Sequence, residues 1–444
     1  MKFIYPKELV YPIIDAWERY LSNFKKRMQI DEIPSPSPEH LETILDVLYH
    51  VSFLTEESRK TSVKVAYFEP INSNLDRLFN HYEQPIKFDK AIQYNVTEVL
   101  RLSPALNPEN TILIVGPENC IDAHSKSNEL VIWGILYLGN DYINLLKGRS
   151  GGAFSPPSIL IIGASAPGSL TISTGGRILC RLNNGRLMEA SLSGLDQGII
   201  GSYFSDEINI LYQETCKQLG TDKYSEEDDF DQHPSQLYFR TLTNIIRLTK
   251  EKFHGGTFLI VPSQLASESD ILSDSLNIKY SIKSPIIWNT IINESIARKK
   301  YFELFFKAAK TVEDFNKQIR SDNIKQRSEE KIFEFEEFVA SLTGVDGAVL
   351  LNTKLEILGF GTEITLSTPE VEYIKEAKDA NGETFTEIPI NSFGTRHRSA
   401  IRFCSKIENS IAIVISQDGS VKAIKKVENS LYLWNNIDVG EFGL

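Results

Sequence analysis

The chain has 444 residues, of which 41% are hydrophobic and 24% are charged, and its formal net charge at pH 7 is −12. This length and composition are typical of a globular protein with two or three domains. The excess of Asp and Glu excludes indiscriminate binding to nucleic acid or to an anionic membrane surface, which needs an excess of Lys and Arg. Any site for a polyanion must therefore be a local basic pocket.

The cysteines and the apolar runs indicate the compartment. Cys120, Cys180, Cys216 and Cys404 are scattered without a C-x-x-C pair or a metal-binding spacing, which is typical of reduced thiols. No apolar run approaches the ~20 residues of a membrane-spanning helix, and residues 1–6 lack the apolar core of a signal peptide. We therefore predict a soluble, cytoplasmic protein with no DNA and no membrane among its partners.

Residues 1–225 have the pattern of a separate α+β domain. A helix is predicted over residues 7–28, and a second helix begins after the proline-rich residues 33–38. Residues 163–169 have the glycine spacing of a phosphate loop, but serine stands where the loop needs lysine, so we interpret them as a turn. Apolar runs predict strands over residues 63–68, 111–115, 130–136 and 159–162, followed by a meander from 170 to 188.

An acidic run, residues 224–231, is typical of a solvated linker, because a metal site needs ligands that converge from separate positions. We place the domain boundary there. A second domain is predicted over residues 235–436, with a helical insertion at about 286–330. Its segments alternate between helical and strand periodicity. The predicted fold class is therefore α/β (α+β), with a mixed β-sheet flanked by helices in the second domain.

Residues 394–400, Gly-Thr-Arg-His-Arg-Ser-Ala, combine two arginines, a histidine, a hydroxyl and a glycine at the predicted start of a helix. A helix start offers unpaired N–H groups and the positive end of the helix dipole. Arginine adds forked donors that match phosphate oxygens, and Gly394 would let the backbone approach a ligand closely. The pattern favours a polyphosphate site, and the alternative is a basic helix start on a solvated surface.

A second motif, Asp346-Gly347-Ala348, follows a predicted helix and opens a predicted strand. A lone Asp-Gly is typical of a turn. Paired with the later Gly-Thr-Arg-His-Arg run, however, it resembles the diadenylate cyclase family, whose catalytic domain carries both motifs. The resemblance covers roughly the last 200 residues. With an additional region in front, the arrangement resembles a soluble branch of that family with a sensor-like N-terminal domain.

The resemblance implies a metal-dependent reaction of two ATP molecules. Each 3′-hydroxyl attacks the α-phosphate of the other ATP, two pyrophosphates leave, and the product is cyclic di-AMP. Such a reaction depends on alignment and on neutralising charge. The resemblance also implies a homo-oligomer, at least a dimer, in which two catalytic domains face each other with one ATP in each. An unknown ligand or protein partner is expected at the N-terminal domain.

The resemblance also assigns roles to the matched residues. Asp346 is expected to hold Mg²⁺ or Mn²⁺ and to favour loss of the proton from the attacking hydroxyl. For His397 the alternatives are a phosphate donor, which we favour, a metal ligand or a helix cap. The expected catalytic residues are Asp346, Arg396, His397 and Arg398, and the expected substrate contacts are Gly347, Ala348, Gly394, Thr395 and Ser416.

Several family members carry Ser-Glu-Glu where this chain has Ser416-Gln417-Asp418. Asp418 would then be a shorter metal ligand, and a plain turn at Asp418-Gly419 is the equal alternative. Two other functions stay open: a sensor that binds ATP or a cyclic dinucleotide without turnover, and a related cyclase with another nucleotide product. Retention of Asp346 together with Arg396, His397 and Arg398 favours the active enzyme over the silent sensor. Base choice depends on the shape of the pocket, which residue spacing does not report.

Overall fold

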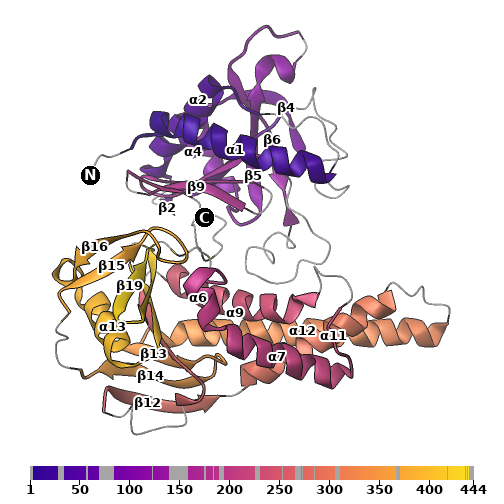
Figure 1. Ribbon diagram of the computed structural model, residues 1–444. Helices are drawn as coiled ribbons and strands as arrows, with labels where there is room; N and C mark the ends of the chain where they lie inside the picture. The colour runs from indigo at the N-terminus through magenta and orange to yellow at the C-terminus, as the bar shows by residue number, and fades with distance from the viewer. Residues whose placement is uncertain are drawn as a thin grey trace. The chain divides into compact units, whose positions relative to one another are not determined.

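The computed structural model divides the chain into two compact units, Met1–Ala190 with Gly440–Leu444 (unit 1) and Ser191–Val439 (unit 2). Figure 1 shows both units and labels many of their helices and strands. None of the described helices is long and apolar enough to cross a membrane. The structure describes residues 4–28, 35–56, 59–69, 85–122, 124–139, 159–174, 177–183, 185–189, 195–225, 231–252, 254–265, 272, 274–284, 286–305, 311–366, 371–417, 419–435, 437 and 439.

Unit 1 is built on a mixed sheet with the strand order β10-β9-β8-β7-β3-β5-β6-β4. The buried strand β3 (Val63–Tyr67) is parallel to β5 (Thr111–Pro117) and antiparallel to β7 (Ile161–Ala166). A separate antiparallel pair joins β1 (Thr55–Glu56) to β2 (Arg59–Lys60). The remaining strands of the sheet are β4 (Ile86–Gln93), β6 (Leu130–Tyr137), β8 (Ser169–Thr174), β9 (Arg177–Asn183) and β10 (Arg186–Glu189).

Amphipathic helices cover this sheet. α1 (Pro6–Met28) and α2 (Pro38–Ser52) place their apolar stripes, including Trp17 and Leu41, in one core with the sheet. α2 begins where Ser37 Oγ accepts a hydrogen bond of 3.2 Å from the backbone N–H of His40, the usual N-terminal cap of a helix. The short helix α4 is Val96–Leu102, and the 3₁₀ turns η1 and η2 are Ser103–Ala105 and Glu118–Cys120.

Unit 2 contains a larger mixed sheet with the order β12-β14-β13-β11-β17-β18-β19-β15-β16. Its strands are β11 (Gly256–Val261), β12 (Leu276–Ser284), β13 (Ala348–Asn352), β14 (Ile357–Ile364), β15 (Tyr373–Ala377), β16 (Phe385–Pro389), β17 (Ile411–Ile415), β18 (Val421–Val427) and β19 (Ser430–Trp434). Its helices are α6 (Gly198–Tyr203), α7 (Ser205–Leu219), α9 (His233–Glu251), α11 (Ile286–Phe305), α12 (Val312–Leu342), α13 (Thr395–Lys406) and the 3₁₀ turn η4 (Ile390–Ser392).

The centre of the unit 2 sheet is buried on both faces, as the alternation of side chains along β11 shows. Phe258 and Ile260 pack into a core shared with α7, α9, α11 and α12. Leu259 and Val261 point into a second core, where they meet the apolar side of α13. Because successive side chains of a strand point to opposite faces, a strand covered on both sides must be apolar throughout. The predicted fold class, a mixed sheet flanked by helices, is confirmed.

The two compact units divide at residue 190, whereas the sequence places the domain boundary at residues 225–235. The physical reason lies in α6 and α7, which precede the acidic run. Phe204 and Leu211 belong to the same core as α9 and α11, and Trp288 Nε1 donates a hydrogen bond of 2.8 Å to Glu214 Oε2. An acidic run indicates that a segment is exposed to solvent, but it does not indicate to which hydrophobic core the preceding helices belong.

Glu336 of α12 gives unit 2 a pH-dependent stability. It is 2% exposed and accepts a hydrogen bond of 3.1 Å from Asn244 Nδ2, and burial raises its pKa from 4.5 to about 8. The folded state therefore binds a proton that the unfolded chain releases above pH 4.5. The resulting stabilisation is complete below that pH and is lost as the pH rises toward 8.

We expect the free energy of unfolding to fall by on the order of 3 kcal/mol between pH 5 and pH 8 because of this group. Glu336→Gln removes the titration and keeps an oxygen for Asn244, so its free energy of unfolding is expected to vary less over this range. Denaturant unfolding at both pH values measures the effect. The matched control is the exposed neighbour Glu337→Gln. An identical pH dependence in wild type and Glu336→Gln would contradict this account.

Candidate functional site

One end of the unit 2 sheet brings distant segments of the chain together. β11 is parallel to β13 and antiparallel to β17. In this register Gly256 lies opposite Ile415, and Phe258 lies opposite Val349. The chain therefore enters β11 and β13, and leaves β17, at the same end of the sheet. Asp346, Gly255 and Ser416 all belong to the short connections at that end.

The arginine motif begins α13 at this end. Gly394 is the residue before the helix, and no side chain caps the helix start. The backbone N–H of Arg398 donates to Gly394 O at 3.1 Å, so the N–H groups of the three preceding residues stand at the helix start. The helix start predicted from the sequence is confirmed, and the buried residues Ala400 and Cys404 hold the helix on the sheet.

Arg396 lies against the connection between α9 and β11. A Cβ atom built on Gly255 would be 2.5 Å from Arg396 Nη1 and 2.7 Å from the carbonyl oxygen of Ile415. The guanidinium therefore occupies the space over Gly255, beside the end of β17. Gly255 has φ +69°, which favours glycine, and only glycine leaves this room for the arginine.

The Asp-Gly-Ala motif lies on the other side of β11. Asp346 is exposed just before β13, and Ala348 is buried and pairs with Thr362 of β14. Gly347 has φ +118°, and a Cβ there would lie 2.5 Å from the carbonyl carbon of Gly361. The backbone itself thus requires glycine at position 347. This is a structural reason for the residue, in addition to the ligand contact expected from the sequence.

Close contacts connect the two motifs through Gly255-Gly256. A Cβ atom built on Gly256 would lie 3.0 Å from Thr343 Cβ. A Cβ atom built on Gly344 would lie 3.9 Å from His254 Nε2. His254 Nδ1 is 2.6 Å from Gly255 O. The turn that leads into Asp346 therefore packs on the same glycine pair over which Arg396 lies. An acidic group and a basic helix start share one end of the sheet.

Two lysines of this region were not predicted from the sequence. The pKa of Lys279 on β12 is raised, mainly by its hydrogen bond to Glu363 and also by the charge of Asp346. Lys250 of α9 lies against the connection after β17, because its Cε is 2.8 Å from where a Cβ on Gly419 would be. The alternating pattern of residues 276–284 is a signal that could have predicted β12 and hence Lys279. Nothing in the spacing of Lys250 indicates its position.

His397 and Arg398 are half-buried at the helix start. The His397 ring lies 5.8 Å from the Phe393 ring, at an angle of 34°. Arg398 Nε is buried and has no hydrogen-bond partner among the described residues. A buried donor of this kind costs free energy unless something accepts its proton. Phosphate oxygen is a suitable acceptor for a guanidinium.

The connection from β17 to β18 is a turn. The backbone N–H of Gly419 donates to Ser416 O at 3.0 Å, and the N–H of Ser416 donates to Ser420 O at 2.9 Å. Ser416 therefore stands where the sequence placed it, directly after a strand at the same end of the sheet as Arg396. Asp418, the second expected metal ligand, lies outside the described residues.

The donor set suits a metal that arrives with its substrate. Among the described residues, no group of three or more His, Cys, Asp or Glu side chains could hold a metal ion by itself. Mg²⁺ is commonly held by one or two carboxylates together with phosphate oxygens and water. The exposed carboxylate of Asp346 fits that requirement.

The fold and this end of the sheet define an α/β protein with a candidate site for a phosphate-bearing ligand. Among protein families, a model described as a probable sensor domain, DACNV, matches residues 30–137. This domain is the N-terminal region of DAC-family proteins and is associated with diadenylate cyclases. The match covers about a quarter of the chain, within unit 1, and ends before the two motifs of unit 2. No curated protein matches the chain.

Gly394 allows the ligand contact to be tested apart from folding. Its φ is −67°, and a Cβ there would meet nothing within 4 Å. We expect Gly394→Ala to leave the free energy of unfolding within about 0.5 kcal/mol of wild type. It should weaken ATP binding by about tenfold, because the methyl group would keep a phosphate away from the first-turn N–H groups. Calorimetric titration and denaturant unfolding measure both, and unchanged ATP affinity would remove Gly394 from the site.

Proposed function

We propose that unit 2 is a diadenylate cyclase that converts two ATP molecules into cyclic di-AMP and two pyrophosphates. The observation that carries the proposal is that Asp346 and the arginine-bearing helix start lie at the same end of the sheet, where Arg396 and the turn before Asp346 pack on Gly255-Gly256. The match of residues 30–137 to a sensor domain associated with diadenylate cyclases supports it independently, because it comes from a different part of the chain.

In the proposed reaction, the O3′ of one ATP attacks the α-phosphorus of the other. A new P–O bond forms, the bond to pyrophosphate breaks, and the hydroxyl proton is lost to solvent or to a nearby base. Arg396, Arg398 and the first-turn N–H groups of α13 bind the triphosphate and stabilise charge on the departing pyrophosphate. Thr395 supplies a hydroxyl beside them, and His397 a ring N–H to a phosphate oxygen.

Asp346 would hold Mg²⁺ or Mn²⁺ on its carboxylate. When bound, the ion neutralises phosphate charge and makes the attacking hydroxyl more acidic. The charge of Asp346 also contributes to the raised pKa of Lys279, whose ammonium pairs with Glu363 at 2.6 Å. We propose Ser416 and the backbone of Gly347 and Ala348 as further substrate contacts, and Asp418 as a second metal ligand.

One such site holds one ATP, whereas ring closure needs two. We therefore propose a homodimer in which two copies of unit 2 face each other, each with ATP bound, so that the product forms across the interface. Unit 1 would respond to a ligand or protein and alter the activity of this assembly. We place the reaction in the cytoplasm, where ATP is supplied and where the four free cysteines stay reduced.

The direct test is to incubate the full chain with ATP and Mg²⁺ or Mn²⁺ and to identify the products by mass, with GTP in parallel. Cyclic di-AMP and pyrophosphate in a 1:2 ratio are the expected products. ATP binding without any product, in a preparation shown to be dimeric, would favour a silent nucleotide sensor. A cyclic product from GTP in place of ATP would favour a related cyclase of different base specificity.

A further inference from the structure

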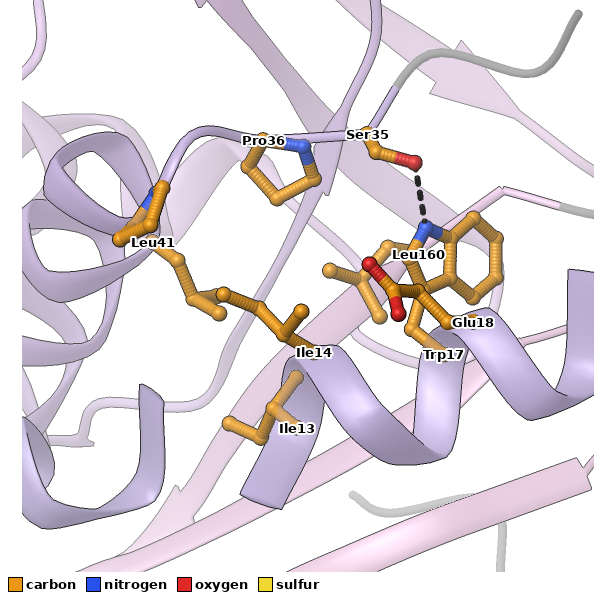
Figure 2. Close-up of a pocket in the computed structure, with 9 residues that line it drawn as sticks. Ile13, Ile14, Trp17, Glu18, Ser35, Pro36, Leu41 and Leu160 are labelled. Carbon is orange, nitrogen blue, oxygen red and sulfur yellow. Dashed lines mark hydrogen bonds between the residues drawn. The ribbon is translucent and has the colours of Figure 1, made fainter. Parts of the chain in front are cut away.

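Unit 1 contains a partly open cavity of about 220 Å³ between α1, the chain leading into α2, α2 itself and Leu160 just before β7. Figure 2 shows side chains from α1 facing Leu160 and the chain that leads into α2. Leu160 is fixed because its carbonyl accepts a hydrogen bond of 3.1 Å from Tyr67 N of β3. The lining residues are Ile13, Ile14, Trp17, Glu18, Ser35, Pro36, Pro38, Leu41 and Leu160.

The size and walls of this cavity limit what it can hold. Most of its lining is aliphatic, proline or indole, and Ile13, Leu41 and Leu160 are at most 1% exposed. An apolar cavity of ~150 Å³ holds one benzene molecule. A cavity of about 220 Å³ therefore has room for a ring-sized apolar group with a short polar extension.

The polar groups of the cavity determine which charge the polar part of a bound molecule can carry. Trp17 Nε1 donates to Ser35 Oγ at 2.9 Å, so the indole N–H is already bonded. The exposed carboxylate of Glu18 forms no ion pair or hydrogen bond with any described residue. Among the described side chains of α1 and α2, Arg19 is paired with Asp15 at 2.9 Å and Lys7 with Glu42 at 3.2 Å. The cavity thus offers one negative charge beside apolar walls.

The cavity also bridges the sensor region and the rest of unit 1. Ser35, Pro36, Pro38 and Leu41 lie within the residues that match the probable sensor domain, whereas the α1 residues and Leu160 lie outside them. A molecule in the cavity would touch both sets at once. Its binding energy would therefore favour the arrangement in which α1 rests on the sensor region.

We infer that this cavity is a ligand site for a small organic cation, an apolar body about the size of one aromatic ring that carries a protonated amine. The amine pairs with Glu18 at the mouth, while the ring lies against Trp17 and the aliphatic walls. A cyclic dinucleotide does not fit, because it is far larger than the cavity and carries negative charge that Glu18 repels. The inference concerns unit 1 and does not depend on the activity proposed for unit 2.

Three probes of matched shape test the site on the full chain: phenethylamine, the neutral 2-phenylethanol and the anionic 3-phenylpropionate. We expect the amine to bind about three- to fivefold more tightly than the alcohol at low ionic strength, and the acid to bind most weakly. Ligand-observed NMR titration gives the three affinities. Ile14→Phe, which fills the cavity, should abolish binding of the amine and the alcohol without lowering the melting temperature.

Glu18→Gln should remove the preference for the amine and leave the affinity of the alcohol unchanged. The control Glu39→Gln removes an exposed charge from α2 outside the cavity lining, and should leave the preference intact. Both positions are exposed, so neither change threatens folding. The inference is overturned by equal binding of the three probes, by a preference that survives Glu18→Gln, or by no binding of phenethylamine at all.

Discussion

Asp346→Asn is expected to lower the rate of cyclic di-AMP formation on the order of 10³-fold while leaving the protein folded. Asparagine keeps the size of the side chain but loses the charge that would hold Mg²⁺ or Mn²⁺. Asp346 is exposed, so the free energy of unfolding should change by less than about 0.5 kcal/mol. Initial rates of product formation, followed by mass, measure the effect across a titration of metal.

Glu363→Gln is the matched control for this substitution. Glu363 lies on β14, is similarly exposed and pairs with Lys279 at 2.6 Å. Glu363→Gln therefore removes an equal charge from the same region without changing the proposed metal ligand. We expect the rate of cyclic di-AMP formation by this variant to stay within about threefold of wild type. If Asp346→Asn retains a tenth or more of the wild-type rate, or if both variants lose activity equally, Asp346 is not the metal ligand. ATP affinity measured without metal should be nearly unchanged in both.

The strands and helices that carry the two motifs could be predicted because their patterns are strong. β11 and β17 are continuous apolar runs, as strands covered on both faces must be. The start of α13 could be predicted from the glycine followed by polar residues and then by a helical apolar stripe. In these places local propensity and burial favour the same structure.

β4 and β12 escaped prediction, and each is an edge strand of its sheet. An edge strand has a neighbour on only one side and stays largely exposed, so it carries polar and charged residues. β4 reads Ile-Lys-Phe-Asp-Lys-Ala-Ile-Gln and has no buried residue. Lys279 belongs to β12, so this cation, whose pKa the charge of Asp346 helps to raise, escaped prediction together with its strand.

The two motifs lie at one end of the sheet because of how the strands pair, and the spacing of residues in the sequence does not predict that pairing. Asp346 and Arg396 lie at the same end of the sheet because β13 is parallel to β11 and β17 is antiparallel to it. Gly255, which makes room for Arg396, could be predicted only as a helix break. The same limit applies to the two glycines of the motifs. Gly347 is required by its own backbone, whereas nothing in the protein's own packing requires glycine at position 394.

Replacement of both Arg396 and Arg398 by alanine is expected to lower kcat/KM for ATP on the order of 10³-fold. Arg396 reaches over Gly255 from an exposed position, and Arg398 has a buried Nε without a hydrogen-bond partner among the described residues. Both guanidinium groups lie at the positive end of α13, where the negatively charged phosphates of ATP would bind. Rates and ATP affinities of the two single variants and the double variant form a complete cycle.

The cycle separates the proposed roles of the two arginines. If both bind the same triphosphate, their losses are non-additive, and the double variant loses less than the product of the single effects. Arg396→Lys should recover only part of the rate, because an ammonium keeps the charge but loses the forked donors. Arg402→Ala removes an arginine from the same helix beyond its first turn. Its kcat/KM for ATP should stay within about threefold of wild type. If Arg402→Ala and Arg396→Ala lower kcat/KM for ATP equally, α13 contributes only its overall positive charge and does not form a specific triphosphate site.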